Sequence, residues 1–169
     1  MCGVYLNRAR VVNIAFFIPM SLFFFLTEEI MIAAGQDPAT AAYSETYVTI
    51  MLPGLFFLFQ RHCTNKFLQA CGVFRPQMYV TICLCFVHIC TCYLLVIVAG
   101  LGIAGAALSM TIYYTLSCFI MFFYAKFSEK TKHTVARFDR SAFQNLSEIL
   151  KYGMPNAAMY FFEHGSAEI

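Results

Sequence analysis

Long apolar runs separated by short polar segments divide the first 125 residues of the chain into four stretches. The runs lie at about 11–34, 41–60, 78–98 and 103–124. A helix needs roughly 20 predominantly apolar residues to cross the hydrocarbon core of a bilayer. We therefore predict an all-α, polytopic membrane protein whose residues 1–125 form four transmembrane helices.

Prolines interrupt two of these spans. Pro19 lies in the first span and Pro53 in the second. A proline removes one helical hydrogen bond, and we expect kinks at both positions because neighbouring membrane helices support them. The second span is also the most polar of the four, with Tyr43 and Tyr47 among its residues. This polarity fits either a helix that lines a cavity or aromatic residues at the membrane interface.

Composition excludes a soluble domain. Charged residues make up 12% of the chain and hydrophobic residues 60%, whereas soluble domains contain about 25% charged residues. The eleven Lys and Arg fall in three clusters, and four of the nine acidic residues lie in 28–45. Cytoplasmic loops collect Lys and Arg, so we place the basic clusters on the cytoplasmic side and 28–45 on the other. The clusters are Arg8 and Arg10; Arg61, Lys66 and Arg75; and residues 126–151.

Four cysteines and a histidine follow one another between Cys83 and Cys92 in the third span. On one helix only Cys85, His88 and Cys92 could share a face, and zinc takes four ligands from more than one direction. We therefore expect no metal site, and we expect His88 to be packed inside the bundle. Most of the eight cysteines lie in apolar runs, where cysteine behaves as a small hydrophobe, and we predict free thiols throughout.

Small residues recur four apart at the start of the fourth span, as Gly102 with Ala106 and Gly105 with Ser109. This spacing lets two membrane helices approach closely. We therefore predict that both pairs are helix-packing positions.

Residues 126–150 differ in character from the spans before them. They are basic, and Ser141 and Gln144 have the spacing of a capping box. Apolar side chains at Phe143, Leu146 and Leu150 follow a helical period. We predict a basic cytoplasmic linker with a short amphipathic helix on the membrane surface.

Residues 151–169 have the pattern of the first part of a further span and contain Pro155 as a third predicted kink. Glu163 follows Lys151 by twelve residues, which is roughly 18 Å along a helix and near mid-membrane. Ionisable groups at that depth are costly, and they usually face a pathway.

Asn156, Tyr160 and Glu163 share one helix stripe that could bind a proton, a small cation or a cationic solute. The alternative is that Glu163 and Glu168 belong to an exposed terminus, because the segment is shorter than a full span.

Five segments, in order, resemble the multidrug and toxic compound extrusion (MATE) antiporters, in particular the eukaryotic branch that includes the plant detoxification transporters. The resemblance covers nearly the whole chain and agrees with the topology derived from charge. The segments are 3–9 (GVYLNRA), 35–38 (GQDP), 52–56 (LPGLF) with 67–69 (FLQ), 100–108 (GLGIAGAAL), and 154–155 (MP) followed by 163–169 (EHGSAEI).

The resemblance implies a non-enzymatic transporter of twelve helices in two six-helix lobes. It would export organic cations and other amphipathic solutes in exchange for protons or sodium, with no other cofactor. By this resemblance the chain corresponds to helices three to six and the start of helix seven. The partners that it implies are membrane lipid and a C-lobe outside this sequence. It implies no binding of nucleic acid. Glu163 and Glu168 match the family's coupling carboxylates, whereas His164 and Gly165 stand where the family usually has two Trp.

Two other functions are compatible with the sequence. A small, non-transporting membrane protein could act as an assembly partner or regulator of a full-length transporter. A lipid-linked sugar flippase of the same wider superfamily would call for a more basic central cavity. We expect a fragment of a multi-pass transporter of the plasma membrane or the vacuolar membrane.

Overall fold

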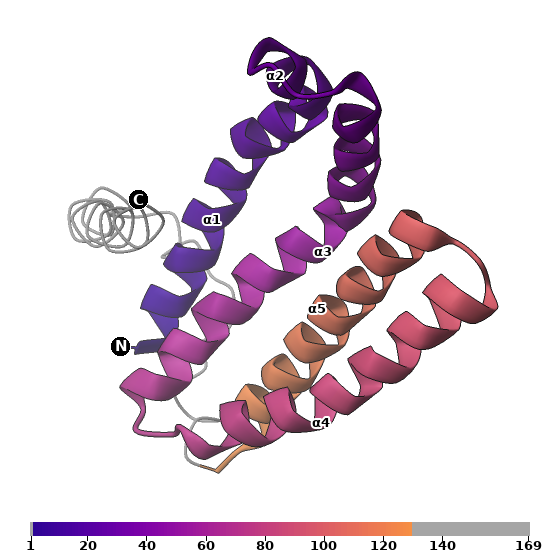
Figure 1. Ribbon diagram of the computed structural model, residues 1–169. Helices are drawn as coiled ribbons and strands as arrows, with labels where there is room; N and C mark the ends of the chain where they lie inside the picture. The colour runs from indigo at the N-terminus through magenta and orange to yellow at the C-terminus, as the bar shows by residue number, and fades with distance from the viewer. Residues whose placement is uncertain (1, 130–169) are drawn as a thin grey trace, which may run out of the picture.

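The computed structural model describes residues 2–129, and every regular element in that range is helical (Figure 1). Four helical segments are long and apolar enough to cross a membrane, namely Tyr5–Phe25, Pro38–Ala70, Arg75–Val98 and Gly102–Phe127. The prediction of an all-α protein with four spans in this part of the chain is therefore confirmed. The elements are α1 Cys2–Phe25, α2 Thr27–Ala33, α3 Pro38–Ala70, α4 Arg75–Tyr93, the π-helix η1 Leu94–Val98, and α5 Gly102–Phe127.

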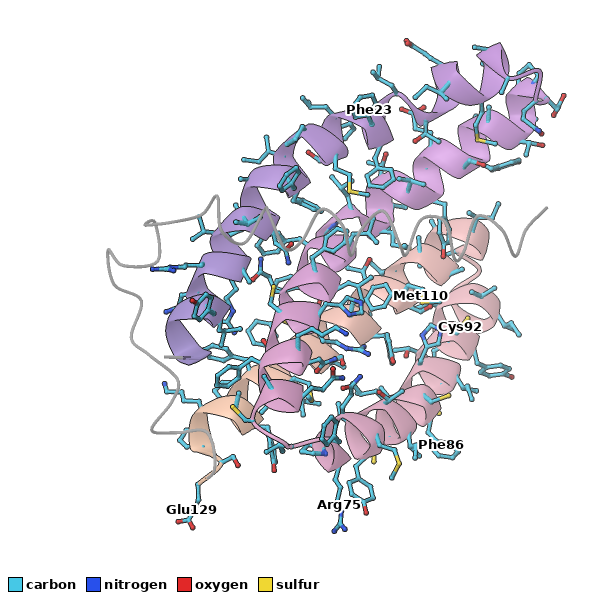
Figure 2. The ribbon with its side chains drawn as sticks, turned by 90° about the vertical axis from the view of Figure 1, so that its left-hand side faces the viewer. Phe23, Arg75, Phe86, Cys92, Met110 and Glu129 are labelled. Carbon is cyan, nitrogen blue, oxygen red and sulfur yellow. The ribbon has the colours of Figure 1, made fainter. Side chains whose placement is uncertain are left out.

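Helix α3 is central to the bundle. It packs against α1 on one side and α5 on the other, while α4 packs on α5. In Figure 1, α1 and α4 run in one direction and α3 and α5 run in the other. Most large apolar side chains on the outer faces, such as Phe23 and Phe86, are exposed (Figure 2). These faces have the surface that a lipid environment requires.

The two ends of the bundle carry the charges that the sequence predicts. At one end, Leu6 of α1, Phe67 and Leu68 of α3, and Met121 of α5 form one buried cluster, which brings together three segments that carry Lys and Arg. At the other end, Glu45 of α3 lies beside the two glutamates of α2.

The first predicted span, 11–34, is not one helix. It begins earlier, at Cys2, and divides at Leu26 between α1 and α2. The Leu26 amide donates to the Phe23 carbonyl at 3.1 Å, and the Thr27 hydroxyl donates to the Phe24 carbonyl at 2.6 Å. These local bonds tighten the turn, and α2 then starts with two glutamates, which suit a helix N-terminus.

The segment between the second and third predicted spans, 41–60 and 78–98, is mostly helical in the structure. Helix α3 continues past Gln60 to Ala70, because Thr64 and Asn65 are buried within the bundle and do not face water. The other end of α3 agrees with its sequence signals, since Asp37 caps the helix through the Thr40 amide and Pro38 follows it.

Glycines set how closely the helices approach. A Cβ on Gly105 would lie 2.7 Å from the Leu95 carbonyl oxygen of η1, and Gly105 and Ser109 are both buried, which agrees with the predicted packing pair. The prediction for Gly102 is wrong. It is the first residue of α5 and has a φ of 52°, with no atom within 4 Å of its Cβ position.

Gly54 lies at a close approach between α3 and α5. A Cβ there would lie 2.8 Å from the Thr111 Cα. The Thr111 hydroxyl donates to the Ile50 carbonyl at 3.1 Å, which adds an interhelical hydrogen bond at the same crossing. Pro53 precedes this glycine inside α3.

The crossing gives a testable prediction. Gly54→Ala should lower the free energy of unfolding by about 1–3 kcal/mol, because the added methyl meets backbone atoms that cannot turn aside. Thermal unfolding in detergent, followed by far-ultraviolet circular dichroism, measures the loss. Ala42→Leu is the control, since Ala42 is an exposed residue of the same helix and the larger substitution should change stability by less than about 0.5 kcal/mol. Equal effects of the two substitutions would contradict the close approach.

Candidate functional site

The residues that the sequence singles out near its end lie outside the described residues. They are Pro155, Asn156, Tyr160, Glu163 and Glu168. Their predicted roles in cation coupling and helix kinking remain predictions. Within residues 2–129, the polar interior of the bundle contains a separate candidate site.

Arg10 is a cation held among three helices. Its Nη2 donates to the Thr64 hydroxyl at 3.0 Å, and its guanidinium carbon lies 5.3 Å from the centre of the Phe122 ring. Its Nε is buried without a hydrogen-bond partner among the residues that the structure describes. The side chain therefore links α1 to α3 and α5, and part of its hydrogen-bonding capacity is unused.

Asn13 makes a second link between α1 and α3. Its Nδ2 donates to the Cys63 thiol at 2.9 Å and lies 3.4 Å from the Phe59 carbonyl. Seven cysteines have described side chains, and all seven are free thiols, as predicted for them.

A groove of about 530 Å³ opens beside these contacts, between α1 and α3 at the basic end. Its wall is mostly apolar, with polar side chains from both helices. The lining residues are Tyr5, Leu6, Ala9, Asn13, His62, Cys63, Lys66, Phe67 and Ala70.

A second polar group lies deeper, among α3, α4 and α5, and we call it the aromatic–arginine cluster: Arg61, His88, Tyr113, Tyr114 and Tyr47. The Arg61 guanidinium carbon is 5.8 Å from the centre of the Tyr113 ring. The Tyr113 ring is 5.6 Å from His88 and 5.4 Å from Tyr114. Tyr114 in turn interacts electrostatically with Tyr47 and Arg61. His88 is therefore packed against an aromatic ring between two helices, as the sequence predicts.

The depth of this cluster was not apparent from the sequence. Arg61 follows directly after the predicted second span, so the charge pattern assigns it to the cytoplasmic side. In the structure it belongs to α3, in which long side chains usually extend toward the helix N-terminus, and its guanidinium lies over the Tyr113 ring. The residue it reaches, Tyr113, is near the middle of α5.

One member of the cluster also lines a second groove, toward the acidic end. Tyr47 belongs to both, and the groove measures about 440 Å³. Tyr43 and Tyr47 of α3 thus line a groove, as one of the two sequence interpretations of that span predicts. The lining residues are Thr40, Tyr43, Ser44, Tyr47, Val48 and Ile103.

Comparison with known proteins gives consistent matches. The MatE family model matches residues 1–94. Protein DETOXIFICATION 17 of Arabidopsis thaliana is 33% identical over 99% of this chain, and Protein DETOXIFICATION 16 of the same plant is 31% identical over 100%. The match covers 35% of each relative, so the chain spans about a third of their length.

A solved structure agrees with the sequence matches. The crystal structure of the eukaryotic MATE transporter AtDTX14 superposes with a TM-score of 0.89 at 28% identity. The superposition covers 94% of this chain and 35% of that one. The expectation that the chain folds as part of one lobe of such a transporter is therefore confirmed.

The Arg10 contact gives a second prediction. Thr64→Val should lower the free energy of unfolding by about 1–3 kcal/mol, because it removes the acceptor of a buried cationic donor without changing side-chain shape. Differential scanning fluorimetry in detergent measures the change. The control is Thr46→Val, since the Thr46 hydroxyl is exposed and bonds only a carbonyl of its own helix among the contacts described. A loss no larger than that of the control would show that the Arg10–Thr64 bond adds little.

Proposed function

This chain belongs to the MatE family, and on that premise we propose that it forms part of one lobe of a secondary active transporter that exports xenobiotics in exchange for protons or sodium. The observation that carries the proposal is the superposition on AtDTX14 over 94% of the chain. The four candidate spans make the protein an integral, multi-pass membrane protein.

The coupling step assigned here uses the carboxylates near the end of the sequence. A membrane-buried carboxyl group favours its neutral form, so its charge must be compensated by a bound proton or cation. Glu163 would release its proton when a cationic solute competes for the same charge, with Tyr160 and Asn156 on the same stripe and Glu168 nearby. Rocking of one lobe against the other would expose the site to each side in turn.

The contacts within residues 2–129 support movement of these helices as a unit. The Arg10–Thr64 bond ties α1 to α3, and the Gly54–Thr111 crossing ties α3 to α5. Lobes that rock need such rigid interiors, because a deformable bundle would not transmit a change at one end to the other.

Glu163→Gln, made in the complete protein that contains this chain, should abolish efflux driven by a proton or sodium gradient. The amide keeps the shape of the side chain but carries no exchangeable charge. Efflux of a fluorescent cationic solute from proteoliposomes with an imposed gradient is the measurement. Glu129→Gln is the control, because Glu129 follows α5 and points away from the bundle (Figure 2). Gradient-driven efflux at an undiminished rate in Glu163→Gln would refute the coupling role.

The length of the native product separates this proposal from an accessory role. The transcript is sequenced through both ends, and the mass of the protein is measured in isolated plasma and vacuolar membranes. We expect a product with a second lobe in one of these two membranes. A stable short product that co-purifies with a longer transporter, and does not itself support efflux, would instead favour an assembly partner or regulator.

A further inference from the structure

Arg61 is a cation inside the bundle for which the surrounding helices supply no carboxylate. Residues 46–128, which include most of α3 and all of α4 and α5, contain no Asp or Glu. Among the described contacts, the Arg61 guanidinium has the Tyr113 ring at 5.8 Å and neither an ion pair nor a hydrogen bond. The acidic residues in the described range are confined to 28–45 and Glu129.

The position of the guanidinium makes this lack of a partner significant. Tyr113 lies eleven residues after the start of α5 and fourteen before its end, or roughly 17 Å and 21 Å along the helix. A charged side chain near the middle of a span is costly and usually faces a pathway or pairs with an opposite charge. An anion that pairs with Arg61 therefore comes from outside residues 46–128.

The neighbours of Arg61 indicate what kind of anion fits. Tyr113 and Tyr114 present two rings at an interplanar angle of 65°, and His88 lies against Tyr113 at 58°. The His88 Nδ1 is buried and has no hydrogen-bond partner in the described part of the chain. Planar aromatic groups pack on such rings in offset or edge-on geometry, and the fork of a guanidinium matches a carboxylate through two parallel hydrogen bonds.

We propose that the aromatic–arginine cluster binds a planar aromatic solute that carries a carboxylate. Arg61 takes the carboxylate, and Tyr113 and Tyr114 contact the ring. Tyr47, which interacts electrostatically with Tyr114, also lines the groove at the acidic end. The inference rests on the proposed function only in treating this solute as cargo, since binding itself needs no transport.

This site differs in charge from the one assigned to coupling. Glu163 attracts a proton or a cation, whereas Arg61 attracts an anion, and the two residues belong to different segments of the chain. The cluster therefore adds an anion site to the cation site that the family resemblance implies.

Three probes with the same ring test the inference: 2-naphthoate, 2-naphthamide and 2-naphthamidine, which carry negative, zero and positive charge. Equilibrium binding is measured with the complete protein in lipid nanodiscs. We expect 2-naphthoate to bind about tenfold or more tightly than the amide, as a charge-assisted pair to the half-buried Arg61 guanidinium predicts, and the amidine to bind most weakly. Equal binding of 2-naphthoate and the amide would overturn the inference, as would tighter binding of the amidine.

Substitutions of Arg61 test whether this residue causes the preference for 2-naphthoate over the amide. Arg61→Gln should remove the preference for 2-naphthoate over the amide, and Arg61→Lys should retain part of it, because lysine keeps the charge without the planar fork. Arg75→Gln is the control for loss of an arginine, since Arg75 points away from the lower end of the bundle (Figure 2) and is exposed. A full preference in Arg61→Gln would also overturn the inference. If that variant does not fold, an undiminished preference in Arg61→Lys does so instead.

The binding experiment and the efflux experiment test the two proposals independently of each other. A protein that exports in a Glu163-dependent manner but shows no preference for 2-naphthoate overturns this inference and leaves the proposed function intact. A protein with Arg61-dependent binding of 2-naphthoate and no efflux overturns the proposed function and supports the anion site.

Discussion

The close approach of α3 to α5 at Gly54 is the constraint on which the rest of the bundle depends. With no side chain at this position, the two backbones meet where a Cβ would lie 2.8 Å from the Thr111 Cα. Within lipid, apolar side chains gain little by leaving one apolar environment for another, so helix association relies on packing and on hydrogen bonds such as that from Thr111 to Ile50. The groove residues of α3 and the rings of α5 hold their relative positions because of this crossing.

Much of the fold could be predicted from the sequence because lipid imposes simple rules. Apolar runs of sufficient length gave four spans, and the distribution of charge gave the arrangement of their ends. The exact ends of the helices could not be predicted in this way. Hydropathy reports where a chain can contact lipid, whereas α3 continues to Ala70 because Thr64 and Asn65 find protein neighbours. The close approach at Gly54 likewise depends on Thr111, which is far from it in sequence.

The candidate site was only partly visible in the sequence. The sequence predicts that His88 is packed, and that Tyr43 and Tyr47 either line a cavity or lie at the interface. Arg61 was missed because a basic residue after an apolar run usually marks a membrane boundary. The direction in which its side chain extends, and the ring it meets on α5, are tertiary facts. A signal was nevertheless present, since residues 46–128 offer no carboxylate to any cation among them.

A fixed positive charge at this depth makes the bundle electrically asymmetric. Moving one elementary charge through the whole membrane potential changes the free energy by about 2.3 kcal/mol per 100 mV, and the Arg61 guanidinium lies against a ring from the middle part of α5. A rocking motion that opened the cluster first to one face and then to the other would shift this charge relative to the field. The balance between outward-open and inward-open states would then vary with voltage, and a bound carboxylate would cancel that dependence by neutralising the moving charge.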